Sequence, residues 1–128
     1  DADRHVRKVA VRALAKVAEK GDERATMGVC ARLENADWHV REVAVRALAE
    51  VAEKRDKRTV TGLCAHLEDA DRHVREAAVK ALAEVAEKRD KRTVTGLCAH
   101  LEDADRHVRE AAVKALADVA EKGDERAI

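Results

Sequence analysis

Residues 70–103 read ADRHVREAAVKALAEVAEKRDKRTVTGLCAHLED, and residues 104–128 begin the same series again. The alignment gives three units with a period of 34 residues, at 21–54, 55–88 and 89–122. The second and third units differ only at Glu84 and Asp118, whereas the first differs at more positions. This near-identity indicates recent duplication or design from a consensus, and the sequence leaves both open. It predicts a repeat architecture.

Each unit contains two helical patterns separated by short polar turns. The shorter pattern follows Asp56 as N-cap, and the longer one follows Asp71. Apolar residues recur at helical spacing in both, at Val60, Leu63, Cys64 and Leu67 in the shorter and at Val74, Ala78, Ala81, Leu82 and Val85 in the longer. No strand pattern lies between them, so the apolar stripes can be buried only against one another and against the next unit. The sequence predicts an all-α fold, an α-solenoid of tandem two-helix repeats.

The 128 residues are expected to form one such solenoid fragment. Residues 1–20 would be a lone long helix, the three units full repeats, and residues 123–128 the start of a further repeat. Neither end resembles a polar cap, so both should expose apolar stacking surface. The residues concerned are Val6, Val9, Ala10 and Leu14 at one end, and Val113, Leu116 and Ala120 at the other. Because these two surfaces are complementary and not identical, they predict head-to-tail self-association.

Composition restricts the classes of partner. Lysine plus arginine and aspartate plus glutamate number 26 each, so the overall charge does not attract nucleic acid or an anionic membrane. A nucleic-acid partner is therefore not expected. No membrane-length apolar run is present, which predicts no membrane partner. Three cysteines spaced 34 residues apart are typical of a reducing compartment, and a cytoplasmic location is expected.

The segment DADRHVREAAVKALAEVA, residues 69–86, resembles HEAT repeats, particularly the HEAT-like type of phycobilin lyases. The resemblance implies that the long helices, at about 3–20, 37–54, 71–88 and 105–122, are inner helices that line a concave face. It also implies a structural ladder, in which a turn aspartate and an arginine six residues later bond from repeat to repeat. Asp1 with Arg7, Asp69 with Arg75 and Asp103 with Arg109 match this pattern. Asn35 with Arg41 departs from it and should weaken one rung, because an amide accepts less strongly than a carboxylate.

Charged residues of alternating sign follow the inner helices at i, i+4 spacing, which stabilises a helix by about 0.2 to 0.5 kcal/mol per pair. The stripes are Glu42, Arg46, Glu50 and Lys54, then Glu76, Lys80, Glu84 and Lys88, then Glu110, Lys114, Asp118 and Lys122. Trp38 is the one aromatic residue, and tryptophan is enriched at binding hot spots. If a protein binds the inner face, its expected contacts are Trp38, Arg46, Glu50, Lys80, Glu84 and Lys114.

The first inner helix instead carries a stripe of one sign, at Lys8, Arg12, Lys16 and Lys20. Such a basic stripe could hold phosphate or an acidic partner. It could equally be a solvated face that pairs with acidic residues of a preceding repeat.

Histidine and cysteine recur without assembling a reaction centre. His5, His39, His73 and His107 form a row, but stacked helices lie about 8 to 10 Å apart, too far for adjacent rungs to share a metal easily. They are interpreted as copied surface residues, as are His66 and His100. Cys30, Cys64 and Cys98 are expected to pack in the core, and Gly28, Gly62 and Gly96 to permit close approach of outer helices. No metal site, catalytic residue or cofactor is predicted.

The favoured function is a non-catalytic HEAT-like scaffold for protein–protein interaction that binds its ligand on the concave inner-helix face. One alternative is a fragment of a HEAT-like enzyme, of the bilin lyase or metal hydroxylase type. Another is a phosphate or nucleic-acid binder that uses the basic stripe. Binding of iron, zinc or phycobilin would indicate the first alternative, and affinity that falls steeply with salt would indicate the second.

Overall fold

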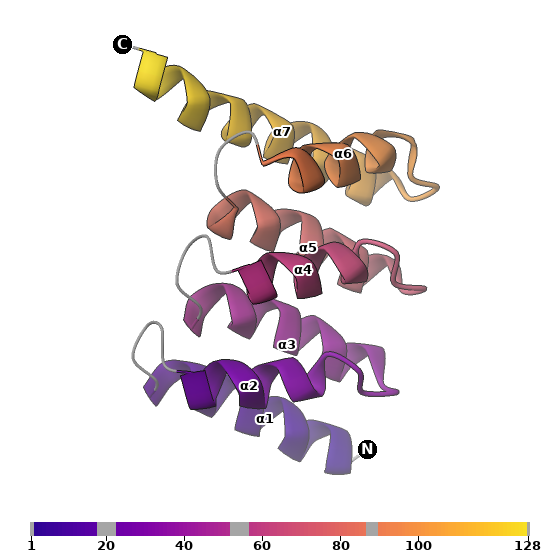
Figure 1. The fold of residues 1–128 in the computed structure, drawn as a ribbon. Coiled ribbons are helices and arrows are strands. Elements are labelled where there is room, and N and C mark those ends of the chain that lie inside the picture. The colour runs from indigo at the N-terminus through magenta and orange to yellow at the C-terminus, as the bar shows by residue number, and fades with distance from the viewer. Residues whose placement is uncertain (1, 18–22, 52–56, 87–89, 128) are drawn as a thin grey trace.

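The computed structural model describes residues 2–17, 23–51, 57–86 and 90–127, which form helices joined by short turns (Figure 1). Every regular element in these ranges is helical, which confirms the predicted all-α solenoid. The helices are α1 (Ala2–Val17), α2 (Glu23–Arg32), α3 (Trp38–Val51), α4 (Lys57–His66), α5 (Arg72–Val85), α6 (Lys91–Ala99), the 3₁₀ turn η1 (His100–Glu102) and α7 (Arg106–Ala127).

The helices are arranged in two layers (Figure 1). The inner layer consists of the long helices α1, α3, α5 and α7, each packed against the next. The outer layer consists of the short helices α2, α4 and α6, each packed against the long helix that follows it. The turns from a short helix to the next long one all lie at the same edge, so residues 34 apart in the sequence are stacked one above another (Figure 1).

Aspartates cap the starts of α5, α6 and α7. Asp71 accepts hydrogen bonds from the backbone N–H groups of His73 and Val74, and Asp105 does the same for His107 and Val108. The carboxylate of Asp90 accepts from the N–H of Thr93 at the start of α6. The predicted cap at Asp56 lies outside the described residues.

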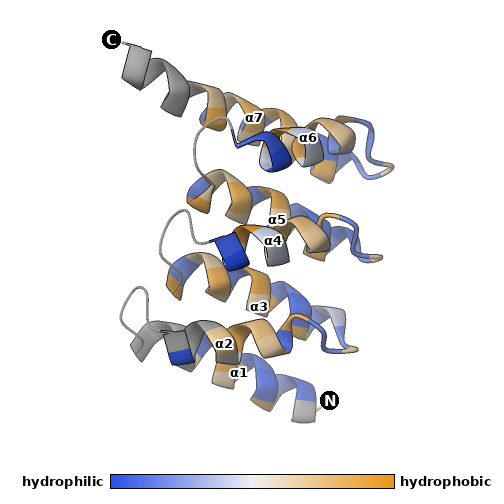
Figure 2. Ribbon diagram, viewed as in Figure 1, coloured by the Kyte–Doolittle hydropathy of each residue, from blue (hydrophilic) through white to orange (hydrophobic). Residues whose placement is uncertain are grey.

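The core lies between the layers and between successive repeats. Leu48, Leu63, Leu82 and Leu97 are completely buried, together with valines and alanines of the inner helices. Burying one leucine stabilises a fold by about 1.5 to 3 kcal/mol. Because equivalent leucines are buried in successive repeats, each repeat adds to the stability of the core. Hydrophobic residues are distributed along the helices, whereas the turns at the common edge are mostly hydrophilic (Figure 2).

Three features differ from the expectations or refine them. Helix α7 continues through Ala127, so residues 123–127 extend it and do not begin a separate helix. Cys30 and Cys64 pack partly buried against the core, but Cys98 is exposed, because within the described residues no outer helix lies beyond α6. No helix in the described ranges has the length and apolar character needed to cross a membrane.

Two of the recurring glycines, Gly62 and Gly96, lie near a leucine of the neighbouring outer segment. A Cβ atom at position 96 would lie 2.6 Å from Cδ1 of Leu67, closer than side chains normally tolerate. At position 62 the corresponding distance, to Cδ1 of Leu33, is 3.4 Å, an ordinary contact. The predicted close approach is therefore tight between α4 and α6 and looser between α2 and α4.

Candidate functional site

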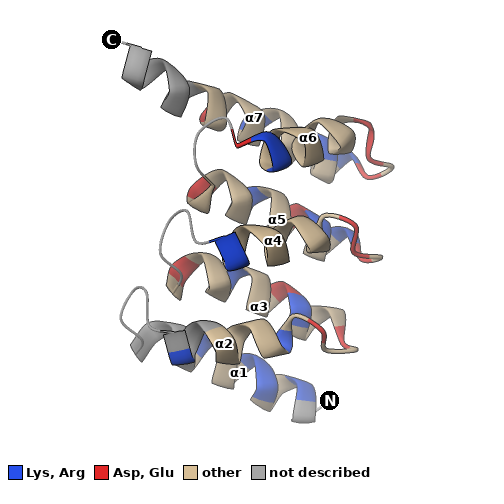
Figure 3. Cartoon of the chain, viewed as in Figure 1, with Lys and Arg blue, Asp and Glu red and all other residues tan. Residues whose placement is uncertain are grey.

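An arginine–aspartate ladder connects the inner helices at the edge where the turns lie. Arg41 donates from Nε and Nη2 to the two carboxylate oxygens of Asp69, at 2.8 and 3.0 Å. Arg75 makes the same two-pronged contact with Asp103, at 2.9 and 3.2 Å. Acidic residues at these turns lie against basic residues of the inner helices (Figure 3). These contacts connect each repeat to the next.

The same arginines also hold their own turns. Nη1 of Arg75 donates to the backbone carbonyls of Asp69 and Ala70, at 2.9 and 3.1 Å. Arg109 makes the equivalent bonds to the carbonyls of Asp103 and Ala104, at 2.7 and 3.1 Å. Each arginine therefore binds backbone carbonyls five and six residues before it. The carboxylates that Arg41 and Arg75 bind belong to the following repeat.

Because each arginine binds the turn aspartate 28 residues later, Asn35 affects a different arginine from the one predicted. Arg41, which the sequence predicted to be affected, donates two hydrogen bonds to Asp69, which lies 28 residues further on. The same spacing from Asn35 leads back to Arg7, whose Nε is buried without a hydrogen-bond partner in the described part of the chain. The prediction that Asn35 weakens the contacts of Arg41 is wrong, because the side chain at this turn position is bound by the arginine of the preceding repeat.

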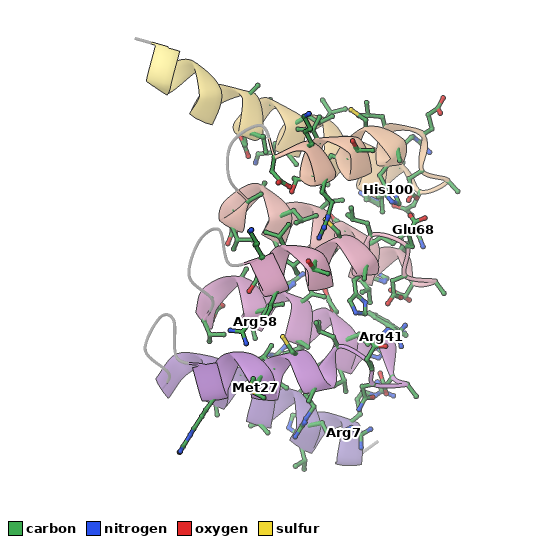
Figure 4. The ribbon with its side chains drawn as sticks, viewed as in Figure 1. Arg7, Met27, Arg41, Arg58, Glu68 and His100 are labelled. Carbon is green, nitrogen blue, oxygen red and sulfur yellow. The ribbon has the colours of Figure 1, made fainter. Side chains whose placement is uncertain are left out.

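His66 and His100 are buried members of the ladder, which corrects their interpretation as surface residues. Nδ1 of His100 lies 2.9 Å from Oδ2 of Asp103, and Nε2 lies 2.9 Å from Oε2 of Glu68 in the preceding repeat (Figure 4). His66 makes longer contacts of 3.3 Å with Asp69 and with Glu34. The recurrence of HLED was visible in the sequence, but the partner 32 residues away from His100 was not.

The ladder holds its carboxyl groups ionised. Burial alone would raise the pKa of Asp103, but hydrogen bonds from Arg75, from the backbone of Asp105 and from His100 lower it to about 2. The pKa of Asp69 is lowered in the same way, against the effect of burial, chiefly by Arg41. Hydrogen bonding to Asp69 in turn raises the pKa of Arg41. These groups stabilise the stacking and are not poised to exchange protons near neutral pH.

Trp38 takes part in a contact between repeats. Its ring stacks on His39, with ring centroids 3.6 Å apart, and on His73 of the next repeat, at 4.7 Å. Arginine at the equivalent position forms ion pairs between repeats, from Arg4 to Asp37 and from Arg72 to Asp105. The half-buried indole therefore substitutes stacking for an ion pair, and less of it is open to a partner than its hot-spot interpretation assumed.

The remaining predicted contact residues lie exposed on the inner helices: Arg46, Glu50, Lys80, Glu84 and Lys114. Two expected pairs form, Glu42 with Arg46 at 2.9 Å and Glu76 with Lys80 at 3.0 Å. In the last repeat Glu110 binds Arg106 at 2.8 Å, and Lys114 has no ion-pair partner within the described residues. The structure thus presents these charges from successive rungs of one layer.

A hollow of about 260 Å³ lies between α5 and α7 on this layer. Its lining combines charged and small residues, namely Lys80, Ala83, Glu84, Ala111, Lys114, Ala115 and Asp118. Three of the predicted contact residues therefore meet around one depression, with alanines below them.

The basic stripe is described only in part. Lys8 is half-buried and Arg12 is exposed on α1. The side chains of Lys16 and Lys20 lie outside the described residues.

The outer layer contains a second hollow, of about 510 Å³, between α4 and α6. It is lined by Cys64, Leu67, Glu68, Lys91, Arg92, Thr95, Gly96, Ala99 and His100. Burial raises the pKa of the Cys64 thiol, which disfavours the reactive thiolate. Across the described ranges, histidine, cysteine, aspartate and glutamate form no group of three that could hold a metal ion.

Comparison with known families agrees with this architecture. The family model for HEAT repeats matches residues 1–83 and again residues 60–128. No curated protein matches the chain, and the narrower resemblance to phycobilin lyases stays a prediction. Since the two matches together span the sequence, the chain belongs to the HEAT repeat family.

Proposed function

We propose that the protein is a non-catalytic scaffold that binds a protein partner on its inner-helix layer. The observation that carries the proposal is the hollow between α5 and α7, around which Lys80, Glu84 and Lys114 meet. HEAT repeats typically serve as protein-interaction scaffolds, and stacked repeats offer extended surfaces that suit this role.

The chemistry of the hollow favours a segment that carries charges of both signs. Lys80 and Glu84 come from α5, and Lys114 and Asp118 from α7, so basic and acidic groups alternate along each wall. The alanines between them leave room for a partner backbone or for small apolar side chains. Lys114 has no ion-pair partner in the described residues, so it can bind a carboxylate without first breaking a pair. We expect such charges to contribute selectivity more than affinity.

Other features of the chain are compatible with a scaffold. The recurring charged and polar residues of the ladder are occupied in holding repeats together, so no cofactor is invoked. We infer a reducing, cytoplasmic environment, in which the three free cysteines would remain reduced.

A displayed library of random peptides, selected against the immobilised chain, tests the proposal. Selected peptides should lose at least about tenfold in affinity, or 1.4 kcal/mol, for Lys80→Glu and for Lys114→Glu, because reversed charges repel the matched groups. Lys57→Glu, on the exposed start of α4 in the outer layer, is the matched control and should bind as the parent does.

Three outcomes would contradict this function. Peptides that bind both inner-layer variants and the parent equally would place recognition elsewhere. Saturable binding of iron, zinc or a phycobilin, measured by direct titration, would favour an enzyme of the HEAT-like class instead. A phosphate or nucleic-acid ligand would be recognised by an affinity that falls steeply as salt is raised.

A further inference from the structure

The ion pairs of the inner layer are more exposed at their basic residue than at their acidic one. The side chain of Arg46 on α3 is 66% exposed, whereas that of Glu42, its ion-pair partner, is 21% exposed. Lys80 and Glu76 on α5 show the same difference, at 62% and 29%. An approaching molecule therefore meets the bases of these pairs before it meets the acids.

One helical turn beyond each base, the same helix carries another acid. These acids are Glu50 on α3, Glu84 on α5 and Asp118 on α7. Glu50 and Glu84 are exposed, and Asp118 is half-buried. Four residues of an α-helix span about 6 Å, so each of these helices presents a base and, that distance further along, an acid.

The stacking of the repeats arranges these charges in two rows that cross the helices. The basic row is Arg46, Lys80 and Lys114, and the acidic row is Glu50, Glu84 and Asp118. Figure 3 shows basic and acidic positions at corresponding places on α3, α5 and α7. The hollow between α5 and α7 has the same arrangement, because one base and one acid from each helix line it. The sign of the charge thus alternates along each helix but stays constant from one helix to the next.

The two rows call for a ligand with charges of the opposite order. Packed helices lie about 8 to 10 Å apart, and like charges at this distance repel one another. A ligand that places acids over the basic row and bases over the acidic row relieves both repulsions. A ligand of one sign would be attracted by one row and repelled by the other.

The spacing within each row favours a helical ligand. On an α-helix, residues seven positions apart share a face and lie about 10.5 Å apart, close to the separation of packed helices. On an extended strand, the side chains of one face recur at about 6.6 Å, which does not match it. The rows therefore fit an α-helix that crosses α3, α5 and α7 along the solenoid axis.

Small residues give such a helix room to approach. Ala83, Ala111 and Ala115 line the hollow between α5 and α7, together with the charged residues of both rows. Ala111 and Ala115 are buried, and Ala83 is half-buried. A helix can pack its small side chains on these alanines, while the long lysine and glutamate side chains reach along its flanks.

We infer that the inner layer binds a partner α-helix that carries two rows of charge, with acids at seven-residue intervals and bases at the same interval three or four residues further on. The acids of the helix face the basic row, and its bases face the acidic row. Both offsets are suitable, because reversing the direction of the helix exchanges its two flanks. The inference rests on the proposed function, to which it adds the conformation and the charge pattern of the partner.

Two synthetic peptides of three heptads each test the inference. In the matched peptide, glutamate occupies the first position of every heptad and lysine the fifth, among alanine and glutamine. The control peptide exchanges the glutamate and the lysine of its middle heptad, so its composition and net charge are the same. Circular dichroism checks that the two peptides are equally helical.

Fluorescence anisotropy of the labelled peptides gives their affinities for the parent chain. The parent should bind the matched peptide at least about tenfold more tightly than the control peptide, because the control places like charges against both rows. The affinity for the matched peptide should also fall as salt is raised, since the charges at the rims of the contact are solvated.

A variant with the charges of α5 exchanged supplies the reciprocal measurement. The double substitution Lys80→Glu and Glu84→Lys keeps the net charge but interrupts both rows at their middle position. This variant should prefer the control peptide by at least about tenfold, because the order of signs then agrees with it. Lys57→Glu, on the exposed start of α4 in the outer layer, is the matched control and should keep the preference of the parent.

Failure of this inference is distinguishable from failure of the proposed function. The inference is overturned if the parent binds neither peptide, if it binds both equally, or if the double variant keeps the preference of the parent. The proposed function still stands in these cases if peptides selected from the random library are weakened by Lys80→Glu and by Lys114→Glu. It falls as well if those selected peptides bind the variants and the parent equally.

Discussion

The first junction between repeats and the two that follow are built from almost the same sequence, yet they are fastened differently. At the later junctions Arg41 and Arg75 hold Asp69 and Asp103 through two hydrogen bonds each. At the first junction the aspartate position is Asn35, and Nε of Arg7 is buried without a partner in the described residues. At this turn position, the two arrangements differ by the replacement of a carboxylate with an amide.

The turn aspartate performs two tasks, and asparagine can perform only one. Oδ1 of Asn35 accepts the N–H of Asp37 at 2.9 Å, as Oδ1 of Asp69 accepts the N–H of Asp71 at 2.9 Å. The second carboxylate oxygen, which completes the contact with arginine, is an NH₂ donor in asparagine and would face another donor. The amide therefore keeps the turn but not the rung between repeats.

The outer layer shows the same gradation. His66 and His100 brace the later turns, whereas the first unit has the exposed residue Arg32 at that position. The first junction is thus expected to be the weakest part of the solenoid.

The largest effect should come from removing an intact rung. Asp69→Ala leaves two nitrogens of Arg41 without a partner in a site where the Asp69 side chain is 5% exposed. We expect a loss of about 2 to 4 kcal/mol in the free energy of unfolding, measured by urea denaturation. Glu84→Ala, at an exposed inner-layer position, should change it by less than about 0.5 kcal/mol. Equal effects of the two substitutions would show that the rung does not fasten the repeats.

Lowering the pH should remove the stability that the ionised aspartates give to the later junctions. The folded-state pKa of Asp103 is lowered from 3.8 to about 2, so its stabilising contribution is fully present above about pH 4. It is lost as the pH falls through the folded-state value. Unfolding of the parent and of Asp103→Asn, compared from about pH 5 to about pH 2, should show a stability difference that shrinks steadily. A difference that is independent of pH would mean that ionisation of Asp103 is not what stabilises the junction.

Alanine at Gly62 and Gly96 compares the outer helices of the second and third junctions. Gly62→Ala should be stabilising by up to about 1 kcal/mol, since alanine favours a helix and its methyl group fits beside Leu33. Gly96→Ala should lose that gain and cost about 1 kcal/mol, because Leu67 would have to move. Thermal unfolding of both variants gives the order, and a reversal would contradict looser packing of the outer helices at the second junction than at the third.

The repetition of the sequence was enough to predict the two-layer solenoid. Helical spacing of apolar residues and the capping aspartates specify each helix locally, and near-identical units must stack in nearly identical ways. The residues of the ladder were predicted as well, through the family resemblance. Their register was not, because the sequence places Asp69 near Arg75, whereas stacking places its carboxylate beside Arg41.

Contacts across junctions account for the other differences. His66 and His100 looked like copied surface residues because their partners, Glu34 and Glu68, lie in the preceding unit. Trp38 looked like a hot spot because the ring on which it stacks, His73, lies in the following one. Helical periodicity describes one element at a time and carries no information on these distances.

The most direct test of the account is a double-mutant cycle at the first junction, with Asn35→Asp made in the parent and in an Arg7→Ala background. Replacing the amide should complete the missing rung and raise the free energy of unfolding by about 0.5 to 1.5 kcal/mol. The gain should vanish when Arg7 is absent, because the added carboxylate then lacks its partner. An equal gain in both backgrounds, or a loss of stability in the parent, would contradict the central claim. That claim is that a turn carboxylate bound by the arginine of the preceding repeat fastens one repeat to the next.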